Sequence, residues 1–141
     1  MTTRLAPLLC LSALSLAAHA ARAAPLEFVP DQAAFKQRVI TASYQHPVMI
    51  EFGAWWCDAC KKLEPVLEQL GEQSPGSLSV VQAEVDALPA TARKYHVEAI
   101  PVLLFFSRGE VIGRLSGEHT LEETRRYFLK LTATRPLSEA P

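Results

Sequence analysis

The spacing of hydrophobic and polar residues changes several times along the chain and predicts strands that alternate with helices. Residues 48–54 are rich in β-branched and aromatic side chains with a single acid, Glu51, which is typical of a strand covered on both faces. From Cys57 to about residue 72, apolar residues recur every three or four positions and predict an amphipathic helix. Pro65 lies inside this helix and predicts a bend, because proline removes a backbone hydrogen bond.

The rest of the chain supplies the elements that such a strand and helix would pack against. Asp31 is placed to cap a first helix that ends near Tyr44, and Thr120 with Glu123 forms a capping box before a last helix. The remaining periodic segments are strands at residues 26–29, 78–85, 102–106 and 111–115 and a short helix at residues 89–96. The predicted order, β-α-β-α-β-α-β-β-α, favours a single α/β domain over residues 26–133.

The first 23 residues have the layout of a secretory signal peptide. Arg4 precedes an apolar stretch of about 14 residues, and small residues that suit cleavage follow at Ala20 and Ala23, of which Ala23 is favoured. A retained membrane anchor would need about 20 apolar residues, which argues against it. We therefore expect export to the periplasm, and we expect residues 134–141 to form a flexible tail.

The charge of the exported chain argues against two classes of partner. Of the 14 basic residues, Arg4 and Arg22 lie in the signal segment, whereas all 15 acidic residues lie outside it. The remaining 12 basic and 15 acidic residues give a formal charge of −3. A nucleic acid or an anionic membrane is therefore not an expected partner, because both attract basic proteins.

Two cysteines remain once Cys10 is removed with the signal segment, and they are separated by two residues. Such a pair indicates a redox centre or half of a metal site, since a disulfide framework would use more cysteines spread along the chain. A structural zinc ion needs about four ligands. The three histidines of the exported chain are scattered, so we expect no metal at Cys57 and Cys60; the histidines are His46, His96 and His119.

The position of the pair suits thiol–disulfide exchange. Cys57 stands at the start of the predicted helix, where free backbone N–H groups and the helix dipole favour the reactive thiolate. Cys60 follows one helical turn later and could resolve the mixed disulfide that Cys57 forms with a client. We therefore expect no cofactor at this site; the redox-active group would be the Cys57–Cys60 disulfide itself.

Two acids are candidates to assist these thiols. Glu51 interrupts a buried strand, where desolvation would raise the pKa of its carboxyl group and suit it to proton exchange; alternatively it reaches solvent at the strand end. Glu64 lies four residues after Cys60 and seven after Cys57, so helical periodicity places all three on one face. A solvated helix charge is the alternative reading of Glu64.

Several motifs occur together at the spacing found in one known family. A buried strand leads through aromatic residues into the cysteine pair, a helix proline follows, and an Ile-Pro pair comes about forty residues later. These motifs are Phe52-Gly53-Ala54-Trp55-Trp56-Cys57-Asp58-Ala59-Cys60-Lys61, Pro65, Ile100-Pro101 and Gly117. Through them the chain resembles the thioredoxin superfamily over residues 32–132, which implies a central mixed β-sheet flanked by helices.

The resemblance also implies roles for individual residues. Pro101 would have a cis peptide bond facing the disulfide and, with Ile100 and Trp56, would bind an extended stretch of the client. Glu51 matches a buried acid, commonly Asp, that shuttles a proton for the resolving cysteine. Glu64 completes a Cys-x-x-Cys-Lys-x-x-Glu run similar to that of the C-terminal domain of the transmembrane thiol:disulfide interchange reductase.

The residues between the cysteines bear on the direction of electron flow. Asp58 carries a negative charge that disfavours the Cys57 thiolate, whereas strong oxidants of this fold have a cationic or dipolar residue there; its neighbour Ala59 adds no charge. Ile100 before the proline is also the residue of thioredoxin-like reductases. Both features favour a reductant.

The leading hypothesis is a periplasmic protein-disulfide reductase that acts as a monomer on disulfide-containing client proteins. Its electrons would come from a membrane thiol:disulfide reductase, because the sequence has no nicotinamide or flavin motif. A disulfide-forming oxidant is the second reading, and a client-binding redox chaperone or assembly factor, for example in cytochrome c maturation, is the third. An isomerase ranks last, because the chain has no residues for an added dimerisation domain.

Overall fold

The computed structural model describes residues 26–134. The signal segment expected at residues 1–23 lies outside the described part of the chain, as does nearly all of the tail expected at residues 134–141. Thr134 is the one exception, because the last helix includes it. Across residues 26–134, every helix is too short or too polar to span a lipid bilayer.

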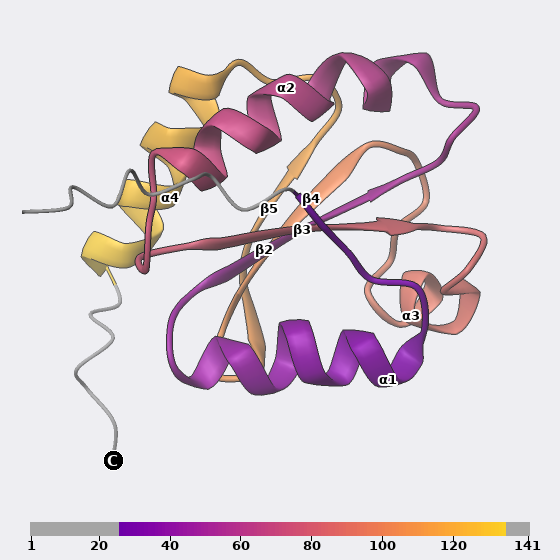
Figure 1. Ribbon diagram of the computed structural model, residues 1–141, viewed down its shortest axis with the longest axis horizontal. Coiled ribbons are helices and arrows are strands. Elements are labelled where there is room, and N and C mark those ends of the chain that lie inside the picture. Colours follow the sequence, from indigo (N-terminus) through magenta and orange to yellow (C-terminus); the bar gives the residue numbers. More distant parts are fainter. Residues whose placement is uncertain (1–25, 135–141) are drawn as a thin grey trace, which may run out of the picture.

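A five-stranded mixed sheet forms the centre of the protein, as predicted (Figure 1). The strands lie in the order β1-β3-β2-β4-β5. The first three run parallel to one another, whereas β4 is antiparallel to both of its neighbours. Strand bounds are β1 Glu27–Phe28, β2 Val48–Gly53, β3 Ser79–Glu84, β4 Val102–Ser107 and β5 Glu110–Ser116. Strand β2 therefore lies in the middle of the sheet with a bonded neighbour on each side.

Helices cover both faces of this sheet and bury two apolar clusters (Figure 1). The first helical segment and α3 (Pro89–Lys94) pack on one face, where Phe35, Val39 and Leu88 join the inward side chains of the strands. On the other face lie α2 (Asp58–Glu72) and α4 (Leu121–Thr134), which bury Leu63, Leu67, Leu70 and Phe128. The alternating sides of β2 thus serve two cores, as expected for a central strand.

The first helix differs from the expected regular α-helix. Asp31 caps it as predicted, because its Oδ1 accepts a hydrogen bond of 2.8 Å from the Ala34 N–H. Only α1 (Gln32–Phe35) is α-helical; a π-helix, η1 (Lys36–Thr41), and a 3₁₀ turn, η2 (Ala42–Tyr44), complete the segment. Hydrophobic spacing did not predict this change, because all three helix types present one apolar face over so short a length.

The strands expected at residues 102–106 and 111–115 are present and form an antiparallel hairpin, and the expected last helix is present as well. Arg108 and Gly109 form a two-residue turn between β4 and β5 with φ angles of 53° and 79°, the left-handed values that such a tight turn requires. The capping box also forms, because Thr120 N–H donates to Glu123 Oε2 at 2.8 Å and Glu123 N–H donates to Thr120 Oγ1 at 3.2 Å. Both results follow from local chemistry that the sequence displays directly.

Phe35 anchors the first helical segment to the sheet and gives a test of this packing. Its ring lies 5.8 Å from that of Tyr95 and 6.0 Å from that of Phe106, and it is almost fully buried. We predict that Phe35→Ala lowers the free energy of unfolding by about 3–5 kcal/mol, through lost burial and the cavity left behind. Denaturant titration of the oxidised protein measures this change.

Leu129 provides the control, because it is 56% exposed on α4. Leu129→Ala should change the free energy of unfolding by no more than about 0.5 kcal/mol. Equal effects of the two substitutions would contradict the assignment of Phe35 to the core.

Candidate active site

The cysteine pair lies where β2 leads into α2. Cys57 is the N-cap of α2 and forms a disulfide with Cys60, with 5.3 Å between the two Cα atoms. The Cys60 N–H donates a hydrogen bond of 3.1 Å to Cys57 Sγ, and the Cys57 N–H donates one of 2.9 Å to the Ala54 carbonyl. The sulfur of Cys57 therefore occupies the position at which a helix N-terminus stabilises negative charge. Helix α2 continues through Pro65, where the expected bend stays a prediction.

The loop that precedes β4 packs against this pair, because Val102 at the start of β4 pairs with Phe52 near the end of β2. The Ile100–Pro101 peptide bond is cis, as the resemblance implied. Ile100 is half-buried and belongs to the small cluster formed around Cys57 and Cys60. The Gly117 N–H donates a hydrogen bond of 2.9 Å to the Pro101 carbonyl, which ties the loop to the residue after β5. Ile100 thus lies beside the disulfide, and its side chain remains partly accessible.

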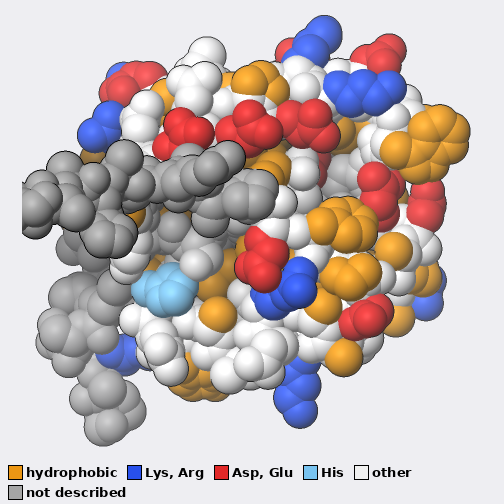
Figure 2. Space-filling view, viewed as in Figure 1, with side chains coloured by type: hydrophobic (Ala, Val, Ile, Leu, Met, Phe, Trp, Pro, Cys, Tyr) orange, Lys and Arg blue, Asp and Glu red, His pale blue; other side chains and the backbone are white. Residues whose placement is uncertain are grey.

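Two tryptophans precede the disulfide and are hydrogen-bonded to Glu84 at the end of β3 and to Asp86 in the turn after it. Trp55 and Trp56 are 74% and 53% exposed. The Trp55 backbone N–H donates to Glu84 Oε2 at 3.0 Å, and Trp56 Nε1–H donates to Asp86 Oδ2 at 3.3 Å. Hydrophobic and acidic side chains accordingly lie together over the N-terminal end of α2 (Figure 2). Trp56 is a surface residue of the site and not a core aromatic.

The two residues between the cysteines differ in exposure. Asp58 is exposed, and its carboxylate lies 3.6 Å from the Lys61 ammonium in the first turn of α2. Ala59 is half-buried and packs against the cysteine cluster. The negative charge of Asp58 is therefore adjacent to Cys57 in sequence but has a cation beside it.

Glu51 lies on the face of β2 that α2 covers, and it is only 2% exposed. Its neighbours across the sheet are Gln82 on β3 and Leu103 on β4. Burial raises the pKa of the Glu51 carboxyl group to about 8, while a hydrogen bond from the Gln82 side chain opposes this shift and the charges of Glu64 and Glu84 add to it. Among residues 26–134, Glu51 Oε1 has no hydrogen-bond partner. The carboxyl group is therefore buried, and near neutral pH it is mostly protonated.

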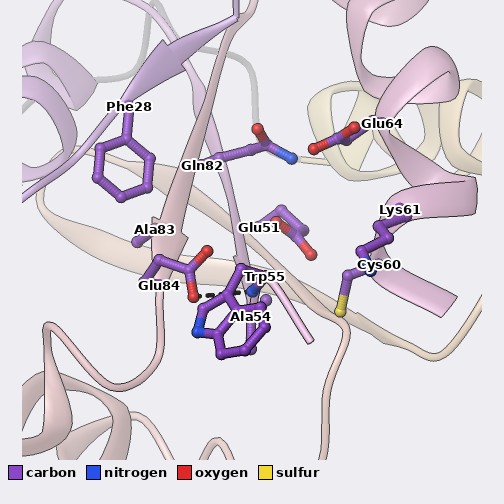
Figure 3. A pocket seen from close by; sticks show the side chains of 11 residues that line it. Phe28, Glu51, Ala54, Trp55, Cys60, Lys61, Glu64, Gln82, Ala83 and Glu84 are labelled. Atoms are coloured by element: carbon purple, nitrogen blue, oxygen red, sulfur yellow. Dashed lines mark hydrogen bonds between the residues drawn. The ribbon is translucent and has the colours of Figure 1, made fainter. Parts of the chain in front are cut away.

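Glu51, Cys60 and Glu64 meet in one pocket with a volume of about 430 Å³ (Figure 3). Glu64 is an exposed residue of α2, yet its carboxylate points back toward Gln82 above Glu51. Lys61 also lines this pocket, whereas Cys57 does not. The predicted shared face of α2 thus brings Glu64 near the buried acid and the second cysteine.

Sequence reasoning missed the residues that support this site from β3 and β2. Glu84, Asp86 and Gln82 are contributed by β3 and the turn after it. Glu84 and Asp86 could have been found, because the carboxyl ends of adjacent parallel strands lie at the same edge of a sheet. Gly53 could have been found as well, since it follows Glu51 by two residues and so shares its face of the strand.

The chain is similar to known proteins of a single family. A family model described as Thioredoxin matches residues 27–130. Thioredoxin C-2 of Corynebacterium nephridii is 41% identical over 71 residues, which are 50% of this chain and 66% of that protein. The thioredoxin of Mycobacterium tuberculosis H37Rv is 39% identical over 75 residues, 53% of this chain and 65% of the relative. These two matches span just under two thirds of the length of the relatives.

A longer match extends over most of the described residues. The thioredoxin of Porphyra purpurea is 34% identical over 100 residues, which are 69% of this chain and 92% of that protein. The more specific resemblance to the C-terminal domain of a transmembrane reductase is not supported by these matches and stays a prediction.

The buried carboxyl group of Glu51 predicts a pH-dependent stability. In the unfolded chain this group has a pKa near 4.5, and in the folded protein about 8, so the folded state binds more protons between these values. The free energy of unfolding therefore falls as the pH rises through this window. Glu51→Gln removes the ionisation, and we predict that it stabilises the oxidised protein by roughly 4 kcal/mol more at pH 9 than at pH 5.

Urea titrations of both proteins at the two pH values measure this difference. Glu68→Gln, which removes an exposed carboxyl group from helix α2, controls for the change in net charge. An equal effect of Glu51→Gln at both pH values would show that the carboxyl group is not buried as described.

Proposed function

The chain belongs to the thioredoxin family of thiol-disulfide oxidoreductases, and from that membership we propose that it is a protein-disulfide reductase acting through Cys57 and Cys60. One observation carries this proposal. The Cys57–Cys60 disulfide lies at the N-terminus of α2, where Cys57 is the N-cap residue. Ile100, which precedes the cis peptide bond to Pro101, packs against the two cysteines. A dithiol in this position has a stabilised thiolate, a resolving thiol and a neighbouring peptide surface for a client.

The reaction begins with the reduced dithiol. The Cys57 thiolate attacks one sulfur of a client disulfide, which forms a mixed disulfide and releases the other client sulfur as a thiolate that takes up a proton. The Cys60 thiolate then attacks Cys57 Sγ, which breaks the mixed disulfide and releases the second client thiol. The client gains two electrons, and the Cys57–Cys60 disulfide is left to be reduced again.

Glu51 serves the second of these steps by exchanging a proton with Cys60, and its ionised fraction, which grows as the pH approaches 8, is the form that accepts the proton. It lines the same pocket as Cys60, so a proton can pass from the Cys60 thiol to the carboxylate directly or through water. A carboxyl pKa near 8 is close to that of a free thiol, about 8.5, so the transfer is nearly balanced in energy. Glu64 acts on the same step through the charge that raises the Glu51 pKa.

The client is held by exposed apolar groups around the disulfide. Trp56 offers a half-exposed ring whose position is fixed by Asp86. Ile100, which is half-buried, packs against the cysteines, and together with the buried Pro101 that follows it would bind an extended client backbone. The charge of Asp58 next to Cys57 disfavours the thiolate, which favours electron flow toward the client.

The cellular setting is part of the same proposal. The signal-like residues 1–23 indicate a periplasmic protein, and a membrane thiol:disulfide reductase would reduce its disulfide, with no cofactor besides that disulfide. Disulfide-containing periplasmic proteins are the client class. The thioredoxins to which the chain is similar support the chemistry but do not address the compartment.

The reduction potential of the cysteine pair tests the direction. Equilibration with defined dithiothreitol mixtures, in a Cys10→Ser background so that only the pair reacts, should give a value near −270 mV, as for thioredoxin. A value near −120 mV, as for strong periplasmic oxidants, would reverse the direction and favour the disulfide-forming reading.

A trapping experiment tests the order of the two cysteines. Cys60→Ser should accumulate mixed disulfides between Cys57 and its clients, because the resolving thiol is missing. Non-reducing electrophoresis of periplasmic extracts measures these adducts, and dithiothreitol should reduce them to the free proteins. Cys57→Ser is the matched control and should form few adducts; equal trapping by both variants would contradict the assigned roles.

A further inference from the structure

The Glu51 carboxyl group occupies space that exists because residue 53 has no side chain. The two residues are separated by one position on β2, so they share the face that α2 covers. A Cβ atom on Gly53 would lie 2.3 Å from Glu51 Oε1 and 2.9 Å from both Cδ and Oε2. The whole carboxyl group therefore lies over the Cα atom of Gly53, at distances that no other side chain at that position would permit.

Backbone conformation does not explain a glycine here. Positive φ angles occur at Gly76, Gly109 and Gly117, but Gly53 lies in a regular strand with a negative or extended backbone that any residue adopts. A glycine in a strand interior weakens the strand and often marks a close approach of another group. The close approach at Gly53 is that of the Glu51 carboxyl group.

We propose that Gly53 is a positioning residue. Because Gly53 has no side chain, the Glu51 carboxyl group can occupy this space, and from this buried position Glu51 exchanges a proton with Cys60. This inference rests on the proposed function, since it concerns the same proton transfer.

A side chain at residue 53 would move the carboxyl group and leave the backbone in place. The atoms that a new Cβ would meet are the far end of a flexible side chain. The adjoining pocket of about 430 Å³ offers room toward Lys61 and Glu64. There the carboxyl group would be more hydrated, and the pKa of Glu51 would fall toward its ordinary value, because burial is the main cause of its rise.

Size complementarity distinguishes this role from a general need for glycine. Aspartate has one methylene fewer than glutamate, so its carboxyl group would end short of a methyl group at residue 53. Glu51→Asp should therefore restore a buried acid in the presence of Gly53→Ala. A residue required only for folding would show no such compensation.

The test compares four full-length proteins in a Cys10→Ser background: the parent, Gly53→Ala, Glu51→Asp and the double variant. Two quantities are measured for each. One is the rate at which Cys60 resolves a mixed disulfide between Cys57 and glutathione, followed from pH 5 to 9. The other is the titration of the residue 51 carboxyl group, followed by carbon NMR.

We expect Gly53→Ala to slow resolution about tenfold at pH 7 and to lower the pKa of the residue 51 carboxyl group. The double variant should recover most of the rate and a raised carboxyl pKa. Gly71→Ala is the matched control, because a Cβ there would meet Val80 at an ordinary 3.7 Å; it should change neither quantity.

Three results would overturn the proposal. The first is a rate and a carboxyl pKa that Gly53→Ala leaves unchanged, and the second is a carboxyl pKa that falls without any loss of rate. The third is a double variant whose resolution rate is reduced by the product of the factors measured for the two single variants, because the substitutions would then act independently. If the parent protein fails to exchange with glutathione at all, the proposed function fails instead, and the NMR titration still reports whether Gly53 positions the carboxyl group.

A folding defect would also be informative. If Gly53→Ala does not fold, Glu51→Ala is added to it, which removes the carboxyl group from the contact. Recovery of the fold would show that the clash is with that group and would support the proposal. Failure of this double variant to fold would overturn it, because the methyl group would then be excluded by something other than Glu51.

Discussion

The burial of β2 along its entire length is the constraint on which the site depends. All six residues of this strand, Val48–Gly53, are buried, with β3 bonded on one side and β4 on the other. The strand therefore ends at a fixed point, and α2 must begin where Cys57 meets the edge of the sheet. Since β3 runs parallel to β2, its end delivers Glu84 and Asp86 to the same edge. The position of the disulfide is thus a property of the sheet more than of the loop that contains it.

An acid in the middle of such a strand lowers the stability of the fold, because its carboxylate is desolvated. The same desolvation raises the pKa of the acid and so suits it to proton exchange. Desolvation of Glu51 disfavours the carboxylate and raises the pKa to about 8. A solvated carboxyl group would be fully ionised at neutral pH and a poor match for a thiol. The protein therefore gives up stability at high pH for an acid that can exchange protons with Cys60, the kind of compromise expected at functional sites.

Much of the fold could be predicted from the sequence, because it follows from local periodicity and capping. The order of elements, the Asp31 and Thr120 caps and the turn at Arg108-Gly109 each depend on a few adjacent residues. The π-helical part of the first helix could not be predicted, since it leaves the apolar spacing unchanged. In the site, the cysteine pair and Glu51 stand out in the sequence. The sheet edge at which Glu84 and Asp86 lie follows from the parallel strand order, whereas the pairing of Gln82 with Glu51 depends on strand register, which no short segment displays. The close approach of the Glu51 carboxyl group to Gly53 depends on where that side chain folds back.

The negative groups around Cys60 also affect how protons are held in the site during turnover. In the disulfide form, the raised pKa of Glu51 reflects burial and the charges of Glu64 and Glu84, since the cysteines carry no proton. After reduction, a Cys60 thiolate and a Glu51 carboxylate in one pocket would repel each other, so each charge raises the pKa of the other group. Two groups that interact in this way release their protons in steps that belong to the pair. Loss of the first proton then makes loss of the second harder, which keeps one proton available beside Cys60 across the neutral range.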